Sequence, residues 1–177
     1  PTAAALGYGL TNPGNLLVID FGGGTLDLSL VRLEGSAAAI KPVGFLLKWG
    51  QRVLEESAQR PKLARVLAKA GQNLGGADID NWLVEHFATR LGLNTSPLIV
   101  RLAERLKIQL SQQETATEVY FNDETFESYE LQLSRPQFEE ILQQHQFFER
   151  LETSLTQVLQ QAQCQGIMPD EIDAVLL

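Results

Sequence analysis

The sequence is poor in the residues that form covalent or metal cross-links. Among its 177 residues are one cysteine, Cys164, and two histidines, His86 and His145. A single cysteine excludes an internal disulfide, and the lack of a Cys/His cluster argues against a zinc site. Cys164 has no basic neighbours in QAQCQG, so we expect no reactive thiol there. This cysteine usage fits a reducing compartment, and we expect a cytoplasmic location.

Positive charge and long apolar runs are also scarce. The chain has 14 Lys and Arg against 22 Asp and Glu, with a net charge of −8 and no basic run longer than a pair of charges. Such a surface does not suit nucleic acid or an anionic membrane. The longest apolar stretches are far shorter than a membrane span, and no charged leader precedes an apolar segment. We therefore expect neither nucleic acid nor membrane among the partners.

The most informative segment is LVIDFGGGTLDLSLV, at residues 17–31. An apolar run leads to Asp20, three glycines and Thr25 follow, and the chain then alternates apolar and polar residues over 26–30. Strict alternation is the period of a half-buried strand. The glycines therefore join two strands, whereas a dinucleotide fingerprint or a Walker loop would open a helix.

This glycine turn has the composition of a phosphate site. Glycine lets the backbone approach a ligand closely, and successive backbone N–H groups form a concavity that suits phosphate. Asp20 and Asp27 flank the turn, and carboxylates beside phosphate suit Mg²⁺, which is usually held partly through waters. The structural alternative is a glycine-rich hairpin turn with acidic ends.

The first part of the chain predicts a small sheet followed by helices. We expect a short helix over 1–10, a hairpin with strands at 16–21 and 25–33, and a third strand over 37–45. From 46 to 70 the apolar spacing becomes helical, with Pro61 dividing it into two helices.

The second part predicts two helices, a hairpin, a long helix and a last strand. Asp78 is the expected N-cap of one helix, and Ser96 with Pro97 begins the next. Alternation over 115–121 and 126–133 predicts a second hairpin. Ser134 and Gln137 form a capping-box pattern before a helix expected to run to residue 162, with Gly166 as its stop. The final apolar run is expected to return to the first sheet as a strand.

The chain is expected to be a piece of a longer protein. It begins without Met and ends in the apolar run IDAVLL, which resembles a buried strand. We expect residues 1–45 and 166–177 to form an incomplete sheet subdomain. Residues 46–165 would form an inserted helix-rich subdomain with a β-hairpin.

Six blocks of the sequence resemble the DnaK-type, seventy-kilodalton heat-shock chaperones, in the order of that family. They are PTAAALGYGL, LVIDFGGGTLDLSLV, LGGADIDNWLVEHF, RLAERLKIQLS, SRPQFEEIL and PDEIDAVLL. The resemblance covers nearly the whole chain. It implies an α/β fold, namely the sheet subdomain of an actin-like (ribonuclease-H-like) ATPase with an inserted α+β helical subdomain.

The resemblance also implies a role for individual residues. The second phosphate loop, which holds the β- and γ-phosphates, matches Gly22, Gly23, Gly24 and Thr25. Carboxylates near Mg²⁺ and the attacking water match Asp20 and Asp27, and a diglycine close to the nucleotide matches Gly75 and Gly76. The adenosine contacts match Glu104, Lys107 and Ser111. Their spacing independently puts these three on one helix face, although a solvated ion pair between Glu104 and Lys107 is the structural alternative.

Three features depart from the family pattern. Ile108 stands where some members carry an arginine that stacks on the base, and Ala77 replaces a usual acidic residue. The segment Leu46 to Asn73 is longer than the common pattern and reads as a helical insertion. These departures concern partner surfaces more than phosphate chemistry.

The implied function is that of a chaperone ATPase using ATP, ADP and Mg²⁺. Its partners would be unfolded client proteins, bound by a substrate domain that this chain lacks, with a nucleotide-exchange factor and a J-domain co-chaperone. The family's first phosphate loop and its catalytic lysine are absent, so we expect this chain alone to be inactive. Two alternatives stay open: another actin-like ATPase such as a sugar kinase, and a non-catalytic protein-interaction module.

Overall fold

The computed structural model describes residues 14–34, 63–123 and 125–177. These residues belong to two compact units. The described part of the first unit consists of residues 14–19, 28–34, 63–70 and 158–177. The second unit consists of residues 20–27 and 71–157. Residues 63–70 and 158–165 thus group with the sheet and residues 20–27 with the second unit. The division into subdomains at 46 and 165 stays a prediction.

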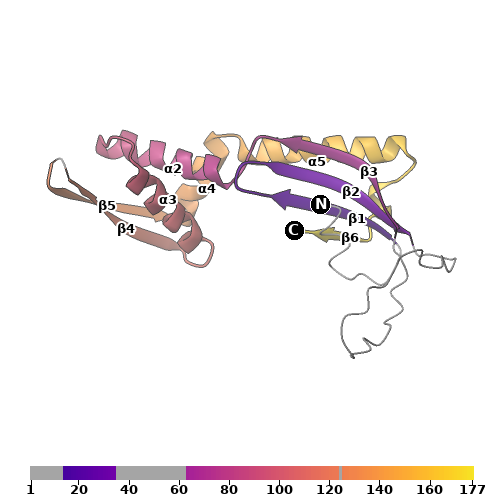
Figure 1. The fold of residues 1–177 in the computed structure, drawn as a ribbon, viewed down its shortest axis with the longest axis horizontal. Coiled ribbons are helices and arrows are strands. Elements are labelled where there is room, and N and C mark those ends of the chain that lie inside the picture. Colours follow the sequence, from indigo (N-terminus) through magenta and orange to yellow (C-terminus); the bar gives the residue numbers. More distant parts are fainter. Residues whose placement is uncertain (1–13, 35–62, 124) are drawn as a thin grey trace, which may run out of the picture. The chain divides into compact units, whose positions relative to one another are not determined.

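A four-stranded sheet forms the first unit (Figure 1). Its strands are β1 (Gly14–Phe21), β2 (Leu26–Glu34), β3 (Leu63–Gln72) and β6 (Ala174–Leu176), in the order β3-β2-β1-β6. Strand β6 pairs in parallel with β1, with Leu16 opposite Ala174 and Val18 opposite Leu176. The prediction that the last strand returns to the first sheet is therefore confirmed.

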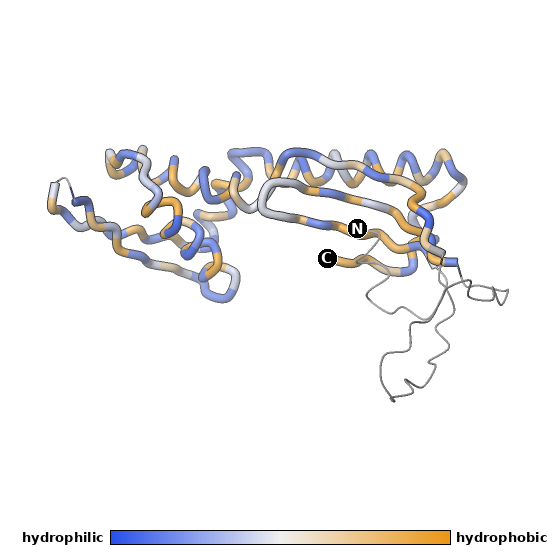
Figure 2. The backbone as a smooth tube through the Cα atoms, viewed as in Figure 1, coloured by the Kyte–Doolittle hydropathy of each residue, from blue (hydrophilic) through white to orange (hydrophobic). Residues whose placement is uncertain are grey.

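The central strand β2 is buried on both of its faces. Four consecutive residues, Leu28 to Val31, are buried, and Figure 2 shows apolar stretches along the strands with hydrophilic residues between them. Helix α5 (Phe147–Cys164) lies beside β3 at its C-terminal end. There the backbone N–H of Lys69 donates to Gln161 Oε1 at 3.1 Å, and Gln165 Nε2 donates to the carbonyl of Leu67.

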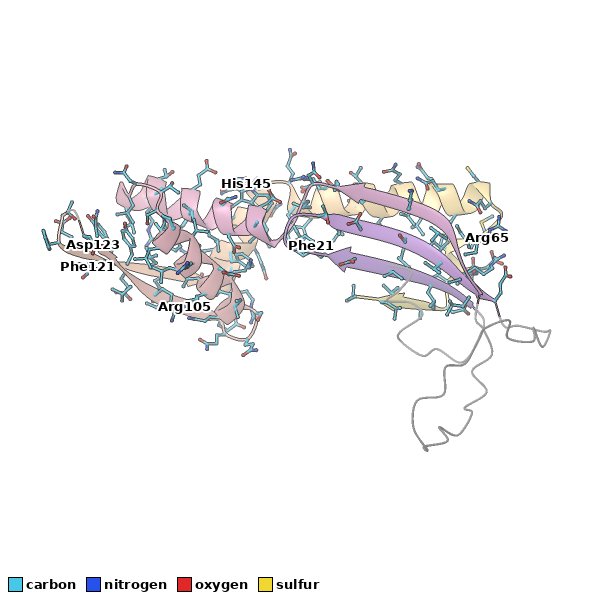
Figure 3. All side chains as sticks on the ribbon, in the orientation of Figure 1. Phe21, Arg65, Arg105, Phe121, Asp123 and His145 are labelled. Carbon is cyan, nitrogen blue, oxygen red and sulfur yellow. The ribbon has the colours of Figure 1, made fainter. Side chains whose placement is uncertain are left out.

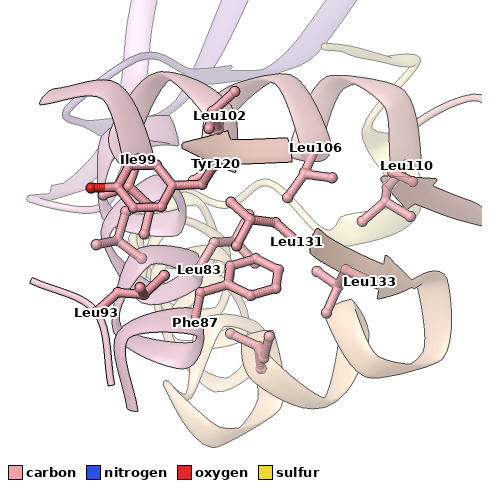
Figure 4. Packing of buried hydrophobic residues seen from close by; sticks show 14 residues of the cluster. Leu83, Phe87, Leu93, Ile99, Leu102, Leu106, Leu110, Tyr120, Leu131 and Leu133 are labelled. Carbon is pink, nitrogen blue, oxygen red and sulfur yellow. The ribbon is translucent and has the colours of Figure 1, made fainter. Parts of the chain in front are cut away.

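The second unit packs two helices on a two-stranded sheet. It contains α2 (Gly76–Leu91), α3 (Pro97–Leu110), β4 (Thr115–Asn122), β5 (Glu127–Ser134) and α4 (Arg135–Gln144), followed by the start of α5. The hairpin register runs from Thr115 opposite Ser134 to Asn122 opposite Glu127. Figure 4 shows its apolar core, whose fully buried side chains include Leu83, Phe87, Ile99, Leu106, Leu131 and Leu133.

Local sequence signals explain several element boundaries. The hydroxyl of Ser96 accepts from the N–H of Ile99 at 3.3 Å, with Pro97 in the first helical turn of α3. Ser134 and Gln137 form the capping box that begins α4. Gly166 follows α5 with a φ of 78°, the left-handed conformation typical of a helix stop. These predictions are confirmed.

Two helix predictions are wrong. The expected helix over 46–70 fails from residue 63 onward, where β3 pairs with β2. The expected long helix over 138–162 is two helices, because Gln146 between them has a φ of 57°. The expectations for 1–10, 37–45 and 46–62 lie outside the described residues.

Helix α2 begins earlier than expected. Its N-cap is Gly75, so Asp78 lies in the first turn and is not the cap that the sequence predicted. In the ranges that the structure covers, no helix has the length and apolarity to span a membrane.

Candidate functional site

A tight glycine turn joins β1 to β2, as the sequence predicted. The N–H of Gly22 donates to the carbonyl of Thr25 at 2.8 Å and closes the turn. Asp20, near the end of β1, is exposed, and Asp27, near the start of β2, is half-buried. Within the described part of the chain, the N–H groups of Gly23 and Gly24 make no backbone hydrogen bond. The turn therefore presents exposed glycine backbone between two carboxylates.

The turn is fastened to the N-terminus of α2. The N–H of Gly76 donates to the carbonyl of Gly22 at 3.0 Å, and the N–H of Ala77 donates to the carbonyl of Gly23 at 2.8 Å. The first N–H groups of a helix have no partner inside the helix and need one elsewhere. Here the turn carbonyls satisfy two of them, so the predicted diglycine lies directly against the glycine turn.

Gly75 has no room for a side chain. A Cβ atom there would lie 2.4 Å from Gly24 N and 2.5 Å from the carbonyl carbon and oxygen of Gly23. These are backbone atoms, which cannot rotate away as the end of a side chain can. A Cβ at Gly23 or Gly24, in contrast, would meet nothing within 4 Å. Gly75 is thus required by the contact between helix and turn, whereas Gly23 and Gly24 leave the turn surface open.

Lys107 connects α3 to this junction. Its Nζ donates to the carbonyl of Gly76 at 3.0 Å and lies 2.6 Å from Asp80 Oδ1. The suggested ion pair between Glu104 and Lys107 is therefore wrong, because Lys107 pairs with Asp80 on α2. Asp80 was not predicted from the sequence. The signal for it was a carboxylate beside Ile79 in the apolar stripe of α2, where a polar residue is unusual.

The three predicted adenosine residues differ in exposure. Glu104 and Ser111 are exposed, and Lys107 is half-buried. The Ser111 hydroxyl donates to the carbonyl of Ile108 at 2.7 Å. Ile108, at the position of the family's variable arginine, is 57% exposed. The helix thus offers a surface with one positioned ammonium and two accessible polar groups.

Two further contacts at the end of β3 were not found from the sequence. A Cβ at Gly71 would lie 2.8 Å from Asp27 Oδ1, so glycine there leaves room for that carboxylate. Arg150 holds the next two residues, donating from Nε to Gln72 Oε1 at 3.2 Å and from Nη2 to the carbonyl of Asn73 at 2.7 Å. Arg150 therefore anchors the segment that leads to Gly75.

The carboxylates fit a magnesium ion held mostly by other ligands. Across the described ranges, no three His, Cys, Asp or Glu side chains gather to hold a metal. Mg²⁺ commonly keeps several waters and takes one or two carboxylates plus phosphate oxygens. Asp20 and Asp27 beside a phosphate-type turn match that donor set.

Comparisons with known proteins identify the family. The family model described as "Hsp70 protein" matches residues 1–46 and 63–177. The chaperone protein DnaK of Thermus thermophilus, in each of two strains, is 32% identical over 195 residues, covering all of this chain and 27% of that protein. The chaperone protein dnaK1 of a Synechocystis species is 34% identical, covering 90% of this chain and 22% of that protein. The chain belongs to the Hsp70 family.

The same comparisons show which part of the family's length this chain covers. The chain spans about a quarter of the length of these curated relatives. The family model leaves out residues 47–62 and resumes at 63, where β3 begins. The predicted insertion, Leu46 to Asn73, is therefore too long at its C-terminal end. Family membership supports the prediction of an Hsp70-family fragment with a mixed α/β fold.

Proposed function

We propose that this part of an Hsp70-family chaperone supplies one side of a site for MgATP and MgADP. The observation that carries the proposal is the junction of three elements: the glycine turn, the N-terminus of α2, and Lys107 of α3. Three hydrogen bonds and one ion pair hold them together, and Gly23 and Gly24 are exposed. Free backbone N–H groups of this kind bind phosphate well.

Each predicted residue has a proposed part in this site. The glycine turn with Thr25 would hold the β- and γ-phosphates, and Asp20 and Asp27 would lie on the Mg²⁺ side. Gly75 and Gly76 would support the turn from behind. The adenosine would be contacted from α3 by Glu104, Lys107 and Ser111. When bound, Mg²⁺ would neutralise phosphate charge, which phosphoryl transfer requires.

Hydrolysis would need groups from outside this chain. The resemblance places another phosphate loop and a catalytic lysine in the family's first lobe, and the sequence here contains neither motif. We therefore propose that the full-length protein hydrolyses ATP while the isolated chain does not. Its proposed partners are unfolded proteins, a nucleotide-exchange factor and a J-domain co-chaperone, in the cytoplasm.

Calorimetric titration of MgADP and MgATP into the full-length protein tests the proposal. Thr25→Ala and Lys107→Ala should each weaken binding roughly tenfold, because each removes a hydrogen bond to a charged or polar ligand group. Thr117→Ala and Arg105→Ala are matched controls, since Thr117 is exposed on β4 and Arg105 is a cation of α3 paired with Glu118. Both controls should bind as the wild type does.

Two results would contradict the proposal. Wild-type protein that binds neither nucleotide would favour the interaction-module alternative. Equal loss of affinity in the controls would show that the substitutions act through general destabilisation. Separately, ATP turnover by the isolated chain above background would refute its predicted inactivity.

A further inference from the structure

Asp80 is a buried carboxylate that pairs with Lys107. The residue is 8% exposed, and its Oδ1 lies 2.6 Å from Lys107 Nζ. Among the residues that the structure describes, no other cation lies within ion-pair distance of it. A buried carboxylate is costly unless it is paired, and the ammonium of Lys107 is the partner that Asp80 has here.

The pair also fixes where the ammonium lies. A lysine side chain has four rotatable carbon–carbon bonds and normally keeps its charge in solvent. Here the side chain of Lys107 is only 21% exposed, between the Asp80 carboxylate and the Gly76 carbonyl. Both partners belong to the first turns of α2, and Gly76 itself donates to the glycine turn. The position of the ammonium is therefore set by α2 and not by α3 alone.

We infer that Asp80 is a positioning residue for Lys107 in nucleotide binding. The inference rests on the proposed function, in which Lys107 contacts the adenosine part of the nucleotide. An ammonium has three N–H donors, and one of them is used on the Gly76 carbonyl. With its charge balanced by Asp80, Lys107 acts toward the ligand as a fixed hydrogen-bond donor. Such a donor suits a neutral acceptor of a nucleoside, such as a sugar hydroxyl, better than a further phosphate.

A double-mutant cycle on the full-length protein tests this role with MgADP as the titrant. Asp80→Asn keeps the shape and removes the charge, and it should weaken MgADP binding roughly tenfold. Lys107→Met should weaken binding at least as much. In the Lys107→Met background, Asp80→Asn should change the affinity by less than about twofold, because its effect passes through the lysine.

Glu118→Gln is the matched control. Glu118 is also a buried carboxylate that pairs with a cation of α3, with Arg105 Nε 3.1 Å from its Oε1. This variant should bind MgADP like the wild type. If Asp80→Asn melts below the assay temperature, Asp80→Glu keeps the charge and moves the carboxylate. Its affinity should then fall severalfold.

The outcomes separate this inference from the proposed function. Wild-type protein that does not bind MgADP would overturn the proposed function and this role with it. Wild-type binding with unchanged affinity in Asp80→Asn or Asp80→Glu would overturn the positioning role alone. So would a loss on Asp80→Asn that is equally large in the Lys107→Met background, since Asp80 would then act independently of the lysine.

Discussion

The two hairpins of this chain have the same strand–turn–strand arrangement, but their turns make different contacts with the rest of the chain. Each joins two consecutive strands through a short turn, β1 to β2 through residues 22–25, and β4, which ends at Asn122, to β5, which begins at Glu127. The glycine turn accepts two hydrogen bonds from the N-terminus of α2. The β4–β5 turn is closed locally, by the N–H of Phe126 donating to the carbonyl of Asn122 at 2.8 Å. Periodicity reveals both hairpins, but only contacts from distant residues mark the first as a candidate site.

The exposed side chains of the second hairpin support this contrast. Phe121 and Asp123 are labelled near its end in Figure 3. Along it Val119 is 63% exposed, Phe121 44% and Phe126 80%. Side chains this exposed contribute little to the core, so substitutions at this turn should affect folding only slightly. Substitutions at the junction of the glycine turn with α2 should affect folding and binding together.

Among the substitutions considered, Gly75→Ala should cause the largest loss of stability. Its Cβ would lie 2.4 Å from Gly24 N, and relief of that clash requires the glycine turn to move away from α2. We expect a loss of about 3 kcal/mol in the free energy of unfolding, at the upper end for overpacking. MgADP binding should also be lost. Denaturant unfolding and calorimetry of the full-length protein measure the two quantities.

Gly23→Ala, at the same junction, should affect MgADP binding without a large change in stability. A Cβ at Gly23 meets nothing within 4 Å, so the free energy of unfolding should stay within about 1 kcal/mol of the wild type. The added methyl group would stand on the open face of the turn and should weaken MgADP binding. If Gly75→Ala were as stable as Gly23→Ala, the close packing of helix on turn would be wrong.

The sequence could predict elements whose signals are local. The glycine turn at Gly22–Thr25, the Ser96–Pro97 start of α3 and the capping box at Ser134 all correspond to contacts within a few residues. The second hairpin was found for the same reason, since its residues alternate between buried and exposed from Thr115 to Phe121. Family resemblance then gave the order of these elements and the proposed role of the glycine turn.

The sequence could not predict features that depend on distant partners. In β3, Leu67 and Ala68 are both buried, so its residues do not alternate and their spacing imitates a helix. Pairing with β2 makes this segment a strand. The break at Gln146 carries no glycine or proline. Asp80 was missed because its partner Lys107 lies 27 positions away on another helix.

At the turn between β4 and β5, a substitution should increase stability, and by a smaller amount. Phe126 has a φ of 57°, a conformation that costs a non-glycine residue roughly 1 kcal/mol. Because its side chain is 80% exposed, Phe126→Gly should lose little packing and stabilise the hairpin by about 0.5 kcal/mol. Hydrogen exchange of the β4 and β5 amides measures this local stability. Ser128→Gly, in the strand itself, should instead destabilise the hairpin.

The smallest effect concerns a hydrogen bond on the same hairpin. The Tyr129 hydroxyl donates to Glu127 Oε2 at 2.6 Å, and this bond is the main reason that the pKa of Tyr129 is raised above its ordinary value of about 10. The neutral phenol is favoured in the folded state, so the contribution of the bond to stability is complete below pH 10. It is lost as the pH rises through the raised pKa. Glu127→Gln should lower the pKa of Tyr129 in an NMR titration of its ring carbons, whereas Glu130→Gln, which changes a carboxylate that does not bond to the phenol, should leave it unchanged. An unaltered pKa in Glu127→Gln would show that this bond does not form in solution, and that the second hairpin is held by its backbone ladder and buried face alone.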